Sequence, residues 1–130
     1  MPRPRAANPI FGSVSLSYIQ GTVRGPAGLE PVRFLIDSGA VYSLLPEQVW
    51  RAIGLAPKRE MDFALADGST IRRAVSECHI SLPQGDAHTP VVLGHPGDAE
   101  PLLGVVTLEI LGLVFDPFHR TLHPMRALLV

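Results

Sequence analysis

The sequence contains one cysteine and almost no net charge, and each shortage excludes a class of protein. Cys78 alone cannot form an internal disulfide and is too few for a cysteine-based zinc site, which is compatible with a reducing compartment. Acidic and basic side chains nearly cancel at a net charge of -1, so the chain lacks the basic surface that nucleic acids or anionic membranes attract. We therefore expect no nucleic-acid partner and no membrane partner.

Long hydrophobic runs are also missing. The most apolar region, residues 101–115, is interrupted by Glu109 and is too short to cross a bilayer. The basic N-terminus, residues 1–5, is not followed by an apolar stretch with a small-residue cleavage site, so we expect no signal peptide. These features predict a cytoplasmic protein.

The 130 residues, of which 46% are hydrophobic, fit one domain with its own core. Residues 1–9 are rich in proline and arginine, and we expect them to form a flexible N-terminal arm before a domain of residues 10–130. The 12 glycines and 13 prolines predict many turns and few long helices.

Short apolar or alternating segments predict an all-β barrel or sandwich. The expected strands lie at residues 14–18, 32–36, 41–45, 61–66, 70–82 and 113–115, with a return at 121–122. Prolines and glycines in residues 82–97 are expected to break the chain around an apolar trio at 91–93. Pro46, followed by apolar residues at helical spacing up to Ile53, predicts one short helix, and residues near 108–111 predict a second.

The tripeptide Asp37-Ser38-Gly39 carries the strongest functional signal. It follows an apolar strand directly, at the point where a buried segment opens into a loop. Backbone amides of a small turn can offset the cost of a charged carboxylate beside a core, and glycine allows close backbone approach. By itself, the same tripeptide is also typical of a turn that ends a strand.

The surroundings of this tripeptide resemble the retropepsin-like, single-domain aspartic proteases of clan AA. The resemblance runs from about Val14 to Pro124 and depends most on residues 34–45 and 101–117. The second segment looks much like the bacterial members of the family. Ser38 stands where many members carry threonine, and Val41-Tyr42 stands where the viral enzymes usually have polar residues, which leaves substrate preference open.

The resemblance implies a retropepsin-like acid-protease barrel that acts as an aspartic endopeptidase on polypeptide substrates. Asp37 would be the catalytic carboxylate. Ser38 would hydrogen-bond across the active-site loops, and Gly39 would donate a backbone amide towards the carboxylates. Other supporting residues would be Ala40, Leu102, Leu103 and Gly104, and the flap that closes over the peptide would have its tip at Ala66, Asp67, Gly68 and Ser69.

This chemistry requires two carboxylates that share one proton, because like charges so close cannot both ionise. The chain has one Asp-Ser-Gly, and Asp67 and Asp116 lie in predicted turns of a different kind. The second Asp37 must therefore come from a second copy related by a two-fold axis, which predicts a homodimer.

Other chemistry has weaker support. Cys78 and His79 are neighbours on a strand and point to opposite faces, so they cannot form a dyad. The remaining histidines are interpreted as surface or satisfied residues, and no phosphate loop, dinucleotide fingerprint or Gly-x-Ser-x-Gly is present. We expect no metal and no cofactor. Arg72-Arg73 is interpreted as solvated charge beside the hairpin, with binding of an acidic substrate as the alternative.

Two further hypotheses stay open at this point. The chain could be a catalytically lapsed, protease-like module that binds or dimerises, although the intact Asp37, Ser38 and Gly39 favour the enzyme. It could also be an unrelated β-domain with a chance Asp-Ser-Gly.

Overall fold

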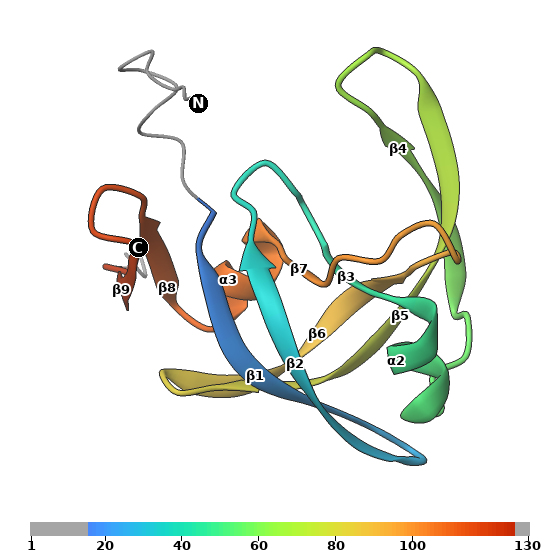
Figure 1. The fold of residues 1–130 in the computed structure, drawn as a ribbon, viewed down its shortest axis with the longest axis horizontal. Helices are drawn as coiled ribbons and strands as arrows, with labels where there is room; N and C mark the ends of the chain where they lie inside the picture. Colours follow the sequence, from blue (N-terminus) through green and yellow to red (C-terminus); the bar gives the residue numbers. More distant parts are fainter. Residues whose placement is uncertain (1–15, 127–130) are drawn as a thin grey trace, which may run out of the picture.

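The computed structural model describes residues 16–126 as a β-barrel with two short helices (Figure 1). The strands are β1 (Tyr18–Gly25), β2 (Gly28–Ile36), β3 (Ser43–Leu45), β4 (Arg59–Ala64), β5 (Thr70–Leu82), β6 (Gly85–Leu93), β7 (Leu102–Leu103), β8 (Leu113–Asp116) and β9 (Thr121–Pro124), and the helices are α2 (Glu47–Ala52) and α3 (Val105–Ile110). Seven strands form one sheet in the order β1-β2-β7-β3-β6-β5-β4, and pairing of β1 with β5 closes it into a barrel. The predicted all-β class with one or two short helices is confirmed, whereas the predicted arm of residues 1–9 lies outside the described residues.

Several predicted strands have different bounds in the structure. β2 begins at Gly28 rather than at residue 32, and β4 covers Arg59–Ala64 rather than residues 61–66. β1 begins at Tyr18, so the strand predicted for residues 14–18 contributes only its last residue, and its first two residues lie outside the described range. β3 begins at Ser43 rather than at Val41. The carbonyl oxygens of Ala40 and Val41 instead accept hydrogen bonds from the first amides of α3, which keeps this segment in a loop.

The break predicted within residues 82–97 is wrong for most of that segment. β6 runs without interruption from Gly85 to Leu93 and includes Pro90. Proline lacks a donor for the strand ladder and is therefore restricted to strand edges. Pro90 meets this condition because β3 pairs with β6 only at residues 91–93, which leaves that side of β6 without a partner strand at Pro90.

The first helix is short, and its C-terminal half is attached to the sheet. Pro46 lies at the N-cap of α2, one residue before the predicted first helical position. The indole N–H of Trp50 donates to the carbonyl of Gly94 at 2.9 Å, which attaches the helix to the end of β6. Gly54 adopts a φ of +77°, a conformation that glycine supplies at little cost, and the chain leaves the helix there.

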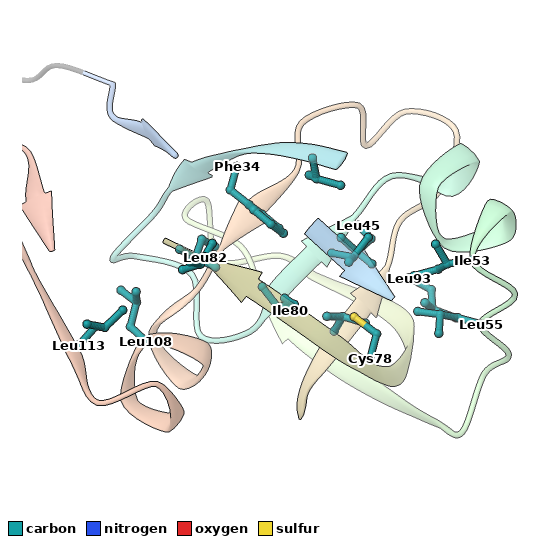
Figure 2. Packing of buried hydrophobic residues seen from close by; sticks show 14 residues of the cluster. Phe34, Leu45, Ile53, Leu55, Cys78, Ile80, Leu82, Leu93, Leu108 and Leu113 are labelled. Atoms are coloured by element: carbon teal, nitrogen blue, oxygen red, sulfur yellow. The ribbon is translucent and has the colours of Figure 1, made fainter. Parts of the chain in front are cut away.

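The hydrophobic core fills the barrel between the sheet and the helices (Figure 2). Its fully buried members include Phe34, Leu45, Ile80 and Leu103, each with no exposed surface. Burial of such side chains stabilises a fold by roughly 25 cal/mol per Å² of apolar surface. Phe34 in β2 and Leu103 in β7 belong to this core, and their packing holds the C-terminal ends of these two strands in place. No helix within residues 16–126 has the length and apolar character needed to cross a membrane.

Candidate active site

Asp37 lies immediately after β2, at the end of the barrel where β2 and β7 run parallel. Leu35 and Ile36 pair with Leu102 and Leu103. The backbone N–H of Asp37 then donates to the carbonyl of Leu103 at 3.0 Å. Leu102 and Leu103 therefore lie beside the Asp37 loop (residues 37–42), and their role in supporting an active site stays a prediction.

The Asp37 carboxylate is held from within its own loop. The N–H of Gly39 donates to Oδ1 of Asp37 at 2.9 Å, and the N–H of Ala40 donates to the carbonyl of Asp37 at 3.1 Å. Asp37 is half-buried, whereas Ser38 is exposed and its hydroxyl makes no hydrogen bond within residues 16–126. The loop thus presents one carboxylate with one oxygen bound to a backbone amide.

A chain of buried hydroxyls lies under the Asp37 loop, and the sequence analysis did not identify it. The N–H of Gly104 donates to Oγ of Ser43 at 3.0 Å, and Ser43 and Thr107 share a hydrogen bond of 2.6 Å. Thr107 and Thr89 share another of 2.8 Å, and Thr89 donates to the carbonyl of Pro90 at 3.4 Å. Each hydroxyl can donate once and accept once along this path, so every donor is used. The network connects β3, α3 and β6 beneath the loop.

Gly104 permits the closest contact in this region. A Cβ atom at Gly104 would lie 2.5 Å from the carbonyl carbon of Tyr42 and 2.9 Å from the amide nitrogen of Ser43. Only glycine allows two backbone segments to approach so closely. The predicted support from Gly104 therefore has a steric explanation.

A cavity of about 510 Å³ opens beside the Asp37 loop and extends under the β4–β5 hairpin. Its lining is mainly apolar: Gly39, Ala40, Val41, Tyr42, Leu44, Met61, Asp62, Phe63, Ala64, Leu65, Ile71, Arg73, Val92, Asp98 and Leu102. Tyr42 meets Phe63 edge to face with ring centres 6.1 Å apart, and Arg59 donates to the Tyr42 hydroxyl at 3.1 Å. These contacts connect the loop to the hairpin, which projects from the barrel in Figure 1.

The interpretation of Arg72-Arg73 as solvated charge holds only for Arg72. Arg72 is exposed and pairs with Glu60 and Asp62. Arg73 has only 16% of its side chain exposed and donates through Nε to Asp98 at 3.1 Å, at the edge of the cavity. Burial acts to raise the pKa of Asp98, but hydrogen bonds from the His95 amide and Arg73, together with the Arg73 charge, hold that pKa below its usual range.

The hairpin tip agrees with its predicted turn, although β4 ends at Ala64 and the connecting loop is longer than expected. The ladder closes at Ala64 and Thr70, and the N–H of Leu65 donates to the carbonyl of Ser69 at 2.8 Å. The Asp67 side chain accepts from the Ser69 amide at 2.9 Å, and this residue and Ala66 are exposed. Gly68 adopts a φ of +89°, as the Asp-Gly pattern predicts.

A second cavity, of about 550 Å³, contains no residue of the Asp37 loop. It lies between the β1–β2 turn, residues 54–58 and the middle of β5, where Cys78 and His79 are. Burial raises the pKa of the Cys78 thiol to about 12, so the thiolate that a nucleophile requires is not formed at neutral pH. His79 instead pairs with Asp86 at 2.6 Å. The smaller cavity is lined by residues 39–42 of the Asp37 loop, although not by Asp37 itself, and the neighbouring carboxylate makes this cavity the candidate site.

The fold and the site together define an acid-protease barrel with one Asp-Ser-Gly loop. The family profile described as "gag-polyprotein putative aspartyl protease" matches residues 20–109, a range that includes the Asp37 loop, the β4–β5 hairpin and Gly104. The chain belongs to this aspartyl protease family.

A solved structure supports the same fold. The EIAV protease complexed with the inhibitor HBY-793 is similar to this chain, with a TM-score of 0.58, 16% sequence identity, and coverage of 75% of this chain and 89% of that one. At this identity the likeness concerns the fold, and it confirms the predicted retropepsin-like barrel. No curated protein sequence matches the chain significantly.

Proposed function

We propose that this protein is an aspartic endopeptidase whose site contains two Asp37 carboxylates, one from each protomer of a homodimer. The observation that carries the proposal is the half-buried Asp37, held by the Gly39 amide beside an apolar cavity, in a chain of the aspartyl protease family. One Asp37 is present in each chain, and the mechanism needs two.

The two carboxylates would divide the acid and base roles. The ionised Asp37 takes a proton from a water molecule as that water attacks the carbonyl carbon of the scissile bond. The protonated Asp37 of the other protomer gives its proton to the carbonyl oxygen. Collapse of the tetrahedral intermediate then breaks the C–N bond. The Asp37 that took up the water proton gives it to the leaving nitrogen, and the other Asp37 takes a proton from the hydroxyl that becomes part of the product carboxyl group, which restores the starting pair. The Gly39 amide holds one carboxylate oxygen in place during these steps.

The cavity favours an apolar substrate side chain next to the scissile bond. Leu44, Val92 and Leu102 supply apolar surface, and the hairpin adds Met61 and Phe63. Arg73 is not available to bind an acidic substrate side chain, because it already pairs with Asp98. We therefore favour a neutral, apolar peptide over the acidic substrate that the two arginines allowed as an alternative.

The β4–β5 hairpin is proposed as the flap, with its tip at residues 66–69. A Cβ atom at Gly68 would meet no neighbouring atom within 4 Å, but a β-branched residue would be strained at a φ of +89°. We expect Gly68→Val to lower turnover about tenfold while the melting temperature changes little, because the strain is confined to an exposed tip.

Gly68→Asn is the matched control, because asparagine tolerates positive φ far better than a β-branched residue. It should retain most of the activity, as measured by peptide cleavage rates alongside thermal unfolding. Equal turnover in Gly68→Val and wild type would mean that the hairpin is not the flap.

The assignment to a bacterial type and the domain bounds are also proposals. The segment of residues 101–117, with Leu102-Leu103-Gly104 followed by α3 and a last hairpin, supports the bacterial type. The family match at residues 20–109 lies inside the proposed domain of residues 10–130, with residues 1–9 as an arm.

Cleavage of an unstructured polypeptide is the direct test of the enzymatic function. Purified protein should cleave it in mild acid, and a transition-state-mimicking inhibitor of aspartic proteases should stop the reaction. Absence of cleavage by a dimeric, folded protein would favour the alternative, a lapsed module that kept the fold and the dimer. Cleavage that the inhibitor leaves unchanged would exclude the Asp37 mechanism.

A further inference from the structure

The larger cavity, of about 550 Å³, lies at a gap in the wall of the barrel. Along one edge of β5, the pairing with β4 ends at Val75 and the pairing with β1 begins at His79. On that edge no strand within residues 16–126 pairs with residues 76–78, and these three residues line the cavity. A short piece of unpaired strand edge therefore faces the cavity.

The backbone of Glu77 presents a donor and an acceptor at this edge. On the β4 side, the carbonyl of Val75 accepts a hydrogen bond from the Lys58 amide at 2.9 Å. Because backbone groups alternate between the two edges of a strand, the N–H and C=O of Glu77 point to the same side as those of Val75. Neither group has a backbone partner there in the described part of the chain. Both can therefore pair with another extended chain.

A buried hydroxyl beside this edge also lacks a partner. Ser76 is only 4% exposed and lines the cavity, and its Oγ forms no hydrogen bond among the residues that the structure describes. Nearly all buried polar groups in native proteins are hydrogen-bonded. The Ser76 hydroxyl therefore indicates a partner that comes from outside the described chain.

The charged side chains around the cavity favour an acidic ligand. Lys58 and Glu77 pair with each other at 3.6 Å, whereas Arg24 forms no ion pair within residues 16–126. Leu55 and Pro57 add apolar surface. The volume lies within the range of roughly 300–1,000 Å³ that is typical of small-ligand sites. The cavity therefore fits a few extended residues with one acidic side chain that pairs with Arg24.

We propose that this cavity is an exosite, a substrate-binding site away from the cleaved bond, which binds an extended acidic segment of the polypeptide substrate along the β5 edge at Glu77. The inference rests on the proposed function, because it takes the substrate to be a polypeptide. The β1–β2 turn lines the cavity, so the cavity and Asp37 lie at opposite ends of β2 (Figure 1). The 9 residues of β2, at about 3.3 Å each, span about 30 Å. The acidic segment would thus lie about nine or more residues from the scissile bond, away from the apolar side chain favoured there.

Binding of the capped peptide acetyl-Thr-Val-Glu-Val-Thr-amide tests the site without a need for activity. In an NMR titration of the isotope-labelled full chain, the amide of Glu77 should shift and those of residues 37–42 should not. Glutamine in place of the peptide's glutamate, or N-methylation of its alternate amides, should each weaken binding about tenfold or more.

Arg24→Ala should weaken binding of the same peptide about tenfold, because it removes the proposed partner of the glutamate. Arg51→Ala is the matched control, since Arg51 is an exposed arginine that pairs with Glu47 and does not line the cavity. It should bind the peptide like wild type, and thermal unfolding checks that both variants are folded. Equal affinity of wild type and Arg24→Ala, or shifts confined to residues 37–42, would overturn the inference.

Cleavage kinetics test whether the segment belongs to the substrate. An acidic segment placed more than about nine residues from the cleaved bond should lower KM relative to the same substrate with glutamines there. Arg24→Ala should remove this difference in KM, and Arg51→Ala should keep it. A KM that does not respond to the acidic segment would overturn the exosite. Binding at Glu77 by a protein that cleaves no polypeptide would support the peptide site while contradicting the proposed function.

Discussion

Asp37→Asn is expected to abolish peptide hydrolysis while the fold and the dimer remain. Asparagine has nearly the same shape and keeps an oxygen that can accept the Gly39 N–H, so the loop should stay in place. It cannot hold or release the proton that the two carboxylates share. General acid–base catalysis typically contributes about 10² to 10⁴ in rate, and the variant should lose at least that much.

Asp86→Asn is the matched control for this experiment. Asp86 is an exposed carboxylate on β6 that pairs with His79 and does not line the cavity beside the Asp37 loop. Rates of both variants should be measured at equal dimer concentration, verified by sedimentation. Cleavage retained by purified Asp37→Asn, or an equal loss in Asp86→Asn, would exclude the mechanism.

Gly104→Ala is expected to destabilise the protein and distort the Asp37 loop. The added methyl would lie 2.5 Å from the carbonyl carbon and 2.7 Å from the carbonyl oxygen of Tyr42, distances that require a backbone shift. The hydrogen bond from the Gly104 N–H to Ser43, in the buried hydroxyl chain, opposes this backbone shift. Overpacking of this kind typically costs about 1–3 kcal/mol, and the free energy of unfolding should fall by at least that amount.

Gly97→Ala is the control for this substitution, because a Cβ atom there meets no neighbour within 4 Å and Gly97 has no positive φ. Urea unfolding should show a change of less than about 1 kcal/mol for Gly97→Ala, or a slight stabilisation. Equal stability of the two variants would show that the approach of Gly104 to Tyr42 is not constrained.

Local sequence patterns were sufficient to predict the parts of the fold that depend on neighbouring residues. Asp67-Gly68-Ser69 predicted the tip of the β4–β5 hairpin, because an Asp-Gly pair supplies the positive φ that the turn requires. The mixed periodicity near residues 108–115 likewise predicted α3 followed by β8, and the structure contains both.

Features that depend on distant residues could not be predicted in this way. Ser43 and Thr107 are 64 positions apart in the sequence, and nothing in their local pattern separates buried hydroxyls from exposed ones. Arg73 and Asp98 are 25 positions apart, so Arg73 was interpreted from its charge alone. The continuity of β6 through Pro90 depends on where β3 stops pairing, which local periodicity does not contain.

The position of Asp37 was predictable, but its pairing with a second carboxylate is a property of two chains. Residues 34–45 and 101–117 carried the resemblance to the retropepsin-like proteases, and the structure brings the ends of these segments together at β2 and β7. Whether two such loops meet depends on the surfaces through which two copies pack, and these surfaces are not encoded in the local pattern around Asp37.

The most direct test of the account is the distance between the two Asp37 carboxylates in a crystal structure of the dimer. The account predicts that their nearest oxygens lie within hydrogen-bonding range, about 2.5–3.2 Å, beside a two-fold axis. A dimer in which the two Asp37 carboxylates lie far apart, with no shared hydrogen bond or bridging water, would contradict it.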